Sequence, residues 1–209
     1  MVQKEPKRRG RPRSYDPETA LARVTASFWK AGYSGTSLDD LSAATGMNRP
    51  SLYGAFGDKR DLYLKALARY WDLSRVAMKE ALAHDQPLRD ALQRVYDKAL
   101  SIYFSGKDGP RGCFAIGTAT TEAVQDAEIR AALAEGFRAI DEAFETRIRF
   151  AKDLGELPRN ADPAALAMLA SATLHTLAIR SRAGTSHAAL QSIVDATLDV
   201  ICATASRTA

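Results

Sequence analysis

The chain has 209 residues, of which 46% are hydrophobic and 26% charged, enough to bury a core as one large domain or two small ones. No apolar run approaches the roughly 20 residues of a membrane span, and no apolar stretch follows the basic N-terminus as in a secretory signal. The two cysteines, Cys113 and Cys202, have no C-x-x-C spacing and suggest no disulfide framework. We therefore expect a reduced, cytoplasmic protein with no membrane partner.

The net charge of +4 is unevenly distributed along the chain. Residues 1–13 contain six Lys or Arg and one Glu, which gives +5, so the other 196 residues sum to −1. A basic arm on a near-neutral body is expected of a protein that touches a polyanion with one end. A solvated tail without a partner is the alternative interpretation.

Apolar residues recur at helical spacing without sustained period-two alternation, so the sequence predicts an all-α fold of about nine helices. Asp and Ser caps mark several helix starts, and glycines mark several ends. In chain order we expect helices from Asp16-Pro17 to Gly32, from Ser37 to Gly46, from Asn48 onward, over roughly 59–84, 87–105 and 113–124, up to Gly155, from Asp162-Pro163 to Gly184, and over the last stretch.

Two short helices between residues 37 and 56 carry the most informative pattern. Their apolar positions are Leu38, Leu41, Leu52 and Phe56, and Gly46-Met47 stands between the helices. Two short helices held at an angle by a small core, with a glycine in the turn, are typical of a helix-turn-helix. The second helix would then enter the major groove by its N-terminal end. Periodicity alone leaves an ordinary helix hairpin as the alternative.

The residues of this segment also match a known signature. Those that carry the match are Gly32-Tyr33, Thr36-Ser37-Leu38, Leu41, Ala44, Gly46-Met47, Leu52-Tyr53, Phe56, Lys59 and Leu62. From about residue 16 to 64 the chain closely resembles the DNA-binding signature of the tetracycline-repressor (TetR) family, and the rest resembles that family in its layout of helices. The resemblance implies a basic arm over 1–15, a helix-turn-helix domain over 16–62, and a ligand-binding and dimerisation domain over 63–209.

The resemblance also implies which residues touch DNA. Helix 38–45 would support a recognition helix over 49–55. Arg49 and its neighbours would face base edges, for which Arg and Asn side chains are suited, and other polar residues would hold phosphates. Many family members carry a small residue or glycine where this chain has Arg49-Pro50. The expected contacts in this domain are Thr36, Ser37, Asn48, Arg49, Pro50, Ser51, Tyr53 and Lys59, of which Thr36, Tyr53 and Lys59 would clamp phosphates.

The arm holds one further candidate contact. Its string Arg9-Gly10-Arg11-Pro12 resembles the core of an AT-hook. Glycine and proline keep such a backbone extended, so Arg9 and Arg11 would lie along an A·T-rich minor groove.

The last two helices carry broad apolar stripes. Such stripes can be plain core, or they can form a four-helix interface between two subunits, which the family resemblance favours. The residues that we assign to this dimer interface are Leu166, Leu169, Thr173, Leu177, Leu190, Ile193, Val194, Leu198 and Ile201.

By the same resemblance, the middle helices hold a pocket for a small-molecule effector. Candidate lining residues are Tyr103, Phe104, Phe114, Thr118, Glu122, Phe137 and His175. Glu122 is the polar candidate that we single out, although aromatics at helical spacing also occur in any core. Cys113 is expected to be a buried, inert thiol. A redox sensor is the alternative, because Cys113 follows Arg111 at an expected helix start, where charge and helix dipole would lower a thiol pKa.

No enzyme signature is present: there is no phosphate loop, no G-x-S-x-G, no H-E-x-x-H and no Cys/His cluster for zinc, so we expect no cofactor and no metal. The sequence predicts a homodimeric repressor that binds a two-half-site DNA operator and is released by an effector. Alternatives are an activator of the same fold, an architectural A·T-rich DNA binder, and an all-α enzyme that lacks any visible catalytic residues. Sequence alone names neither the effector nor the operator.

Overall fold

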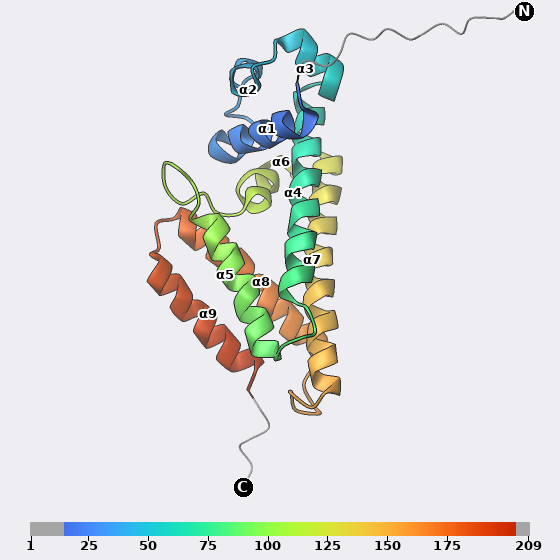
Figure 1. The fold of residues 1–209 in the computed structure, drawn as a ribbon, viewed down its shortest axis with the longest axis vertical. Coiled ribbons are helices and arrows are strands. Elements are labelled where there is room, and N and C mark those ends of the chain that lie inside the picture. Colours follow the sequence, from blue (N-terminus) through green and yellow to red (C-terminus); the bar gives the residue numbers. More distant parts are fainter. Residues whose placement is uncertain (1–14, 204–209) are drawn as a thin grey trace, which may run out of the picture.

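The computed structural model describes residues 15–203, and within them it confirms the predicted all-α fold of nine α-helices (Figure 1). Arg9 and Arg11 lie outside the described residues. The helices are α1 Pro17–Ala31, α2 Leu38–Thr45, α3 Arg49–Phe56, α4 Lys59–Ala81, α5 Leu88–Tyr103, α6 Thr120–Glu122, α7 Ala127–Asp153, α8 Pro163–Arg182 and α9 His187–Ile201.

Local side chains set the ends of the short helices. Ser37 and Asp40 form a reciprocal capping box at the start of α2, and Asp58 and Asp61 form another at the start of α4. Gly46 ends α2 with a φ of 72°, a left-handed conformation that glycine adopts without steric cost. The chain therefore turns sharply between α2 and α3, as the helix-turn-helix pattern predicts.

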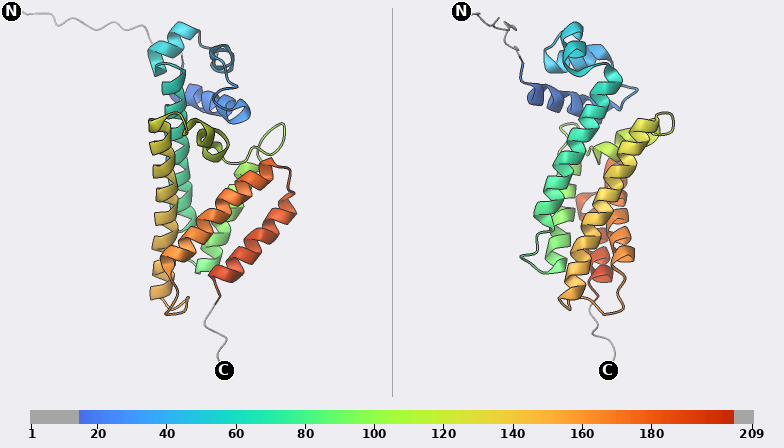
Figure 2. Two further views of the ribbon diagram at one scale, coloured as in Figure 1. Left: turned by 180° about the vertical axis from the view of Figure 1, so that it is seen from behind. Right: turned by 90° about the vertical axis from the view of Figure 1, so that its right-hand side faces the viewer.

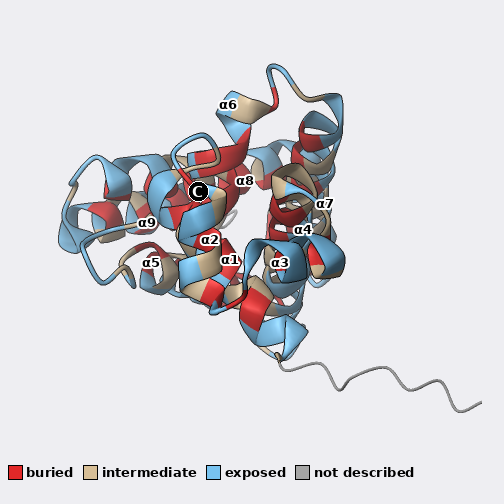
Figure 3. Ribbon diagram, turned by 90° about the horizontal axis from the view of Figure 1, so that it is seen from above, coloured by how far each residue is buried: buried red, intermediate tan, exposed pale blue. Residues whose placement is uncertain are grey.

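The helices form a head and a body that share α4. Helices α1–α3 make the head at one end of the molecule and pack on the first turns of α4 (Figures 1 and 2). Helix α4 then continues through the body beside α7, while α5, α8 and α9 complete the bundle. Seen from above, the buried residues lie between the helices and the exposed ones face outward (Figure 3). Helix α4 is therefore the element that the head and the body have in common.

The predicted helix over 113–124 is wrong in detail. The segment forms a π-helical stretch, Ala115–Ala119, followed by the single turn of α6. The hydroxyls of Thr118 and Thr120 donate to the carbonyls of Phe114 and Ile116, four residues back, at 2.8 and 2.9 Å. Such bonds compete with regular helix geometry, and Gly117 further weakens helical preference.

Helix α8 is apolar on more than one side. Among the described helices it is the one long and apolar enough, by composition, to cross a membrane. Its inward side packs against α5, α7 and α9, as in the core helix of a bundle. Its opposite side leaves apolar side chains exposed, among them Met168 and Ile179.

Candidate functional site

A small core fixes α3 against the rest of the head. Leu41 of α2 and Leu52 of α3 are fully buried, and Phe56 and Met47 are nearly so. These contacts leave the N-terminal turn of α3 exposed at the surface of the head. The arrangement has the geometry that a helix-turn-helix needs to present its second helix to the major groove.

The exposed turn of α3 carries the polar residues expected there. Asn48 caps the helix, because its Oδ1 accepts from the backbone N–H of Ser51 at 2.9 Å. Arg49 forms a two-point ion pair with Asp39 of α2, at 2.8 Å from Nε and 2.6 Å from Nη2. Pro50 occupies the first turn, where its missing N–H is tolerated. Tyr53 is exposed, with its ring on the surface of the same helix.

Three further predicted DNA contacts lie before α2 or at the start of α4. Lys59 is the first residue of α4, and its ammonium lies 4.4 Å from the centre of the Tyr33 ring. Ser37 is exposed, and its hydroxyl donates to Asp40 in the capping box at 2.6 Å. Thr36 is only 2% exposed, and its hydroxyl donates to the carbonyl of Gly32 at 2.6 Å. The predicted phosphate contact of the Thr36 side chain is therefore wrong for this structure, because the hydroxyl is buried and already bonded.

This chain is similar to known proteins along most of its length. Residues 21–66 match the bacterial regulatory proteins of the tetR family, and residues 90–197 match the tetracyclin repressor-like C-terminal domain. The HTH-type transcriptional repressor ComR of Escherichia coli is 31% identical over 192 residues, which cover 92% of this chain and 91% of ComR. The chain belongs to the TetR family. It is therefore a DNA-binding transcriptional regulator.

Solved TetR structures agree with this assignment. The regulator CifR, solved as a cysteine mutant with a 26-base-pair operator DNA, is 30% identical and gives a TM-score of 0.77, covering 90% of this chain and 98% of CifR. A TetR regulator from Chloroflexus aurantiacus is 24% identical and shares the fold with a TM-score of 0.79, covering 90% of this chain and 94% of its own.

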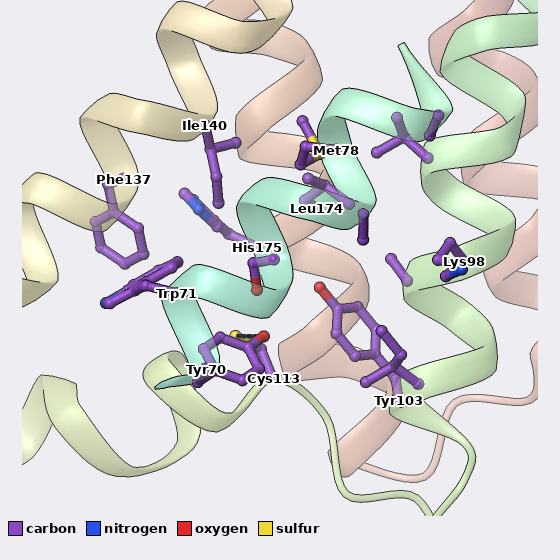
Figure 4. Close-up of a pocket in the computed structure, with 16 residues that line it drawn as sticks. Tyr70, Trp71, Met78, Lys98, Tyr103, Cys113, Phe137, Ile140, Leu174 and His175 are labelled. Atoms are coloured by element: carbon purple, nitrogen blue, oxygen red, sulfur yellow. Dashed lines mark hydrogen bonds between the residues drawn. The ribbon is translucent and has the colours of Figure 1, made fainter. Parts of the chain in front are cut away.

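The body of this TetR chain encloses a cavity of about 70 Å³ between α4, α5, α7 and α8 (Figure 4). Tyr103, Phe137 and His175, three of the seven residues predicted for an effector pocket, line it. Sequence reasoning missed the contribution of α4, which supplies Tyr70, Trp71, Ser74, Ala77, Met78 and Ala81. The signal for this contribution is the run of apolar and aromatic residues at helical spacing along α4, among them Tyr70, Trp71 and Met78.

The other four predicted pocket residues lie outside this cavity. Phe114 is fully buried and packs against the rings of Trp29, Tyr63 and Tyr70 with centroids 5.5–5.9 Å apart. Phe104 lies against the ring of His187, 5.2 Å away. The pocket prediction was wrong for these two because an aromatic at helical spacing gives no information about which side of its helix faces the cavity.

Thr118 and Glu122 instead join the head to the body. The Thr118 hydroxyl and the Tyr63 hydroxyl are hydrogen-bonded at 2.7 Å, and both groups are buried. Ser34 donates to Glu122 Oε1 at 3.1 Å across the surface of the junction. The prediction of Glu122 as a polar pocket residue is therefore wrong, because its carboxylate faces the head.

Further polar contacts strengthen the same junction. Trp29 donates its indole N–H to the carbonyl of Arg111 at 3.2 Å, and the Arg111 guanidinium stacks 3.8 Å from the Trp29 ring centre. Arg60 of α4 binds Asp126 at 2.5 and 2.9 Å and Glu128 at 2.8 Å. The guanidinium of Arg60 holds the pKa of the Asp126 carboxyl well below its usual range. These pairs are separated by more than 60 residues in the sequence, so no local pattern could predict them.

The polar groups of the cavity are largely unused. Tyr70 and Cys113 form a hydrogen bond of 3.0 Å, drawn dashed in Figure 4. Trp71 Nε1 and His175 Nε2 are buried and have no hydrogen-bond partner among the described residues. Burial lowers the pKa of His175, which favours its neutral form.

The burial of Cys113 agrees with the expected buried thiol and not with the alternative of a redox sensor. Cys113 is buried, and burial raises the pKa of its thiol despite hydrogen bonds that act in the opposite direction. The Arg111 guanidinium lies over the Trp29 ring, 3.8 Å from its centre. A thiolate-based redox sensor therefore finds no support at this position.

Most of the predicted dimer residues are buried within one subunit. They form part of the core between α5, α8 and α9, and they are Thr173, Leu177, Leu190, Val194, Leu198 and Ile201. The Thr173 and Thr197 hydroxyls are hydrogen-bonded at 3.2 Å, which links α8 to α9. Leu169 is exposed, and Leu166 and Ile193 are partly exposed. The assignment of the six buried residues to a subunit contact was wrong, because the apolar stripes of α8 and α9 pack against each other within one subunit.

Proposed function

We propose that this protein is a cytoplasmic, ligand-responsive transcriptional repressor that binds a two-half-site operator as a homodimer. The observation that carries the proposal is the shared helix: α4 begins in the head with Lys59 and lines the body cavity with Tyr70 and Trp71. Effector binding next to these side chains would displace the same rigid element that supports the recognition helix. DNA binding and ligand binding are therefore mechanically linked.

The outward faces of α8 and α9 form the proposed dimer interface. The exposed side chains at helical spacing are Ala165, Met168, Leu169, Ala172 and Ile179 on α8 and Ala189, Ala196 and Val200 on α9. Small and apolar residues allow helices of two subunits to approach closely and bury their surfaces in a four-helix contact. This assignment replaces the buried residues that the sequence suggested.

The DNA interface follows from the exposed turn of α3. We assign base contacts to Asn48 and Arg49, and phosphate contacts to Ser51, Tyr53 and Lys59. Asp39 holds the Arg49 guanidinium in place at the surface, which limits the conformational entropy that binding must remove. Ser37, the N-cap residue of α2, lies two residues before Asp39 in the sequence. A dimer doubles these contacts and fixes the spacing between half-sites.

Selection from random duplex DNA, using the full-length protein, tests the DNA-binding part of the proposal. We expect an enriched sequence with two-fold symmetry and half-site centres about 34–36 Å, or a multiple of this, apart. Placed between a promoter and a reporter gene, the selected site should lower expression when the protein is present. Increased expression would make the protein an activator, and enrichment of A·T-rich DNA without symmetry would favour an architectural binder.

The effector part needs a separate experiment. Compounds that raise the melting temperature of the protein should be tested for release of the selected DNA in fluorescence anisotropy. Ala99→Phe fills the cavity from α5, whereas Ala134→Phe changes an exposed site on α7 outside it. A true effector loses its action on the first variant and keeps it on the second. Equal action on both variants would contradict the assignment of this cavity.

A further inference from the structure

A second hollow lies on the other side of the α4 wall. It is a groove of about 680 Å³ between α4 and α7, which run side by side in Figures 1 and 2. Trp71, Ser74, Met78 and Ile140 line both this groove and the enclosed cavity. The groove has the volume of a small-molecule site. The two spaces therefore adjoin each other along a wall that these four residues form.

The groove is apolar along most of its length. Gly136 allows the α7 backbone to approach the Trp71 indole, since a Cβ on this residue would lie 2.1 Å from the ring. Ala139 and Ala143 continue the floor along α7, and Met78 and Leu82 continue the opposite wall. From Gly136 to the far end at Arg147, α7 advances about 16 Å at 1.5 Å per residue. An extended hydrocarbon chain fits such a space.

A buried cation closes the end of the groove that is furthest from the head. Arg147 is 1% exposed, and its Nη2 donates to the carbonyl of Gln86 at 2.6 Å. Its Nε and Nη1 have no hydrogen-bond partner among the described residues. The carboxylate of Glu156 is 4.0 Å away, beyond hydrogen-bond distance, and its Oε2 already accepts from the N–H of Leu88 at 2.6 Å. The guanidinium stays charged at any physiological pH. Its one ion pair among the described residues, with Glu156, is long and carries no hydrogen bond.

The remaining charges around the groove favour an anion as well. Lys79 lies on the α4 side and forms no ion pair within residues 15–203. Glu142, the one carboxylate that lines the groove, is 3.7 Å from the guanidinium of Arg138. Arg75, at the Trp71 end of the groove, is paired with Asp72. The positive charge without a close carboxylate therefore lies toward Arg147, and with the apolar floor it matches a molecule with an anionic head and an apolar tail.

We propose that the α4–α7 groove binds a single-chain aliphatic carboxylate, with its carboxylate on Arg147 and its chain along Ala143 and Ala139 toward Trp71. A carboxylate bound there would accept from Nε and Nη1, the pair of donors that the chain itself leaves unused. The tail would remove the apolar floor of the groove from water. This site adjoins the enclosed cavity, and its assignment does not depend on the proposed repressor function.

Quenching of Trp71 fluorescence by a terminally brominated decanoate tests the proposal, because bromine quenches an indole that it touches. The protein carries Trp29→Phe, so that Trp71 is the single tryptophan, and circular dichroism confirms its fold. The matched uncharged probe is the terminally brominated decanol. We expect saturable quenching by both and at least about ten-fold tighter binding of the decanoate, as charge-assisted hydrogen bonds require.

Two variants locate the bound probe. Arg147→Met keeps the buried volume and should remove the preference for decanoate over decanol. Ala139→Phe should block both probes by filling the groove, and Ala134→Phe, on an exposed site of the same helix, should block neither. If Arg147→Met fails to fold, two measurements still test the proposal. They are the preference of the parent protein for decanoate over decanol, and the comparison of Ala139→Phe with Ala134→Phe.

Three results would overturn the proposal. Absence of saturable quenching means that no such chain occupies the groove. Equal affinity for decanoate and decanol in the parent protein means that Arg147 offers no anion site. Quenching that survives Ala139→Phe places the probe in the enclosed cavity, which Trp71 also lines. No operator DNA is present in these measurements, so their failure leaves the proposed repressor function to its own test.

Discussion

Replacing Ala172 with arginine should separate the subunits of the proposed dimer without unfolding them. Ala172 is exposed midway along the outward face of α8, so within one subunit the longer side chain meets only solvent. In a two-fold interface the substitution places two guanidinium groups in one buried patch. An unpaired buried charge costs several kcal/mol, so we expect the dimer Kd to rise by at least about a hundred-fold.

Leu198→Ala is the complementary substitution. Leu198 is 1% exposed within a single subunit and belongs to the core between α9 and its neighbours. Truncating a buried leucine costs about 2–5 kcal/mol. For a chain of this length, such a loss lowers the melting temperature by about 4–20 °C. This substitution therefore reduces the stability of the fold, whereas Ala172→Arg acts on the association of subunits.

Light scattering after size exclusion, run over a range of protein concentrations beside circular dichroism, separates these effects. Ala172→Arg should give a helical monomer at concentrations where the control Ala134→Arg, on an exposed site of α7, remains a dimer. An Ala172→Arg protein that dimerises as tightly as the control would refute the proposed interface. A Leu198→Ala protein that keeps its melting temperature but dissociates would refute its assignment to the core.

Five further outcomes are expected. In anisotropy titrations, Arg49→Ala should lower affinity for the selected DNA about ten-fold per half-site and leave affinity for random DNA unchanged. Lys59→Ala should weaken binding to both DNAs alike and reduce the salt dependence of binding by about one ion per subunit. Removing residues 1–13 should weaken binding more for sites with A·T flanks than with G·C flanks, and equal affinities would exclude a role for the arm. Tyr63→Phe removes a buried hydrogen bond and should cost about 1 kcal/mol in chemical denaturation; an unchanged midpoint would contradict this. Burial lowers the pKa of His175 in the folded protein, so the unfolded chain binds a proton more readily than the folded one. The free energy of unfolding therefore decreases as the pH falls below the ordinary histidine pKa. His175→Gln should reduce this decrease between about pH 7 and 5 in chemical denaturation.

The head could be predicted because its structure depends on neighbours in the sequence. The capping boxes, the glycine between α2 and α3, and the pair Leu41 and Leu52 all lie within one short segment. Each signal has a local physical cause, so the sequence alone gives the boundaries of α1–α3 to within a residue or two. The same locality makes the exposed turn of α3 predictable as a candidate DNA contact.

The body was harder to predict because its helices offer several apolar sides at once. In α8 the buried Leu177 and the exposed Ile179 are both apolar, and only the position of α9 decides which one faces inward. Periodicity shows that an apolar face exists, but not what covers it. Phe114 illustrates the same limit for the cavity, since its partners Trp29 and Tyr63 come from the head.

If the proposed effector acts through the junction between head and body, the contacts of that junction limit how strongly it can change DNA binding. Reversing an equilibrium from about 99:1 to 1:99 needs roughly 5.5 kcal/mol, whereas a single buried hydrogen bond contributes about 1 kcal/mol. No single contact of the junction is large enough, so the Tyr63–Thr118 bond, the Trp29–Arg111 stack and the Arg60–Asp126 pair must change together. A substitution at one of them should therefore alter the effector response by about five-fold, the factor that 1 kcal/mol provides, rather than abolish it.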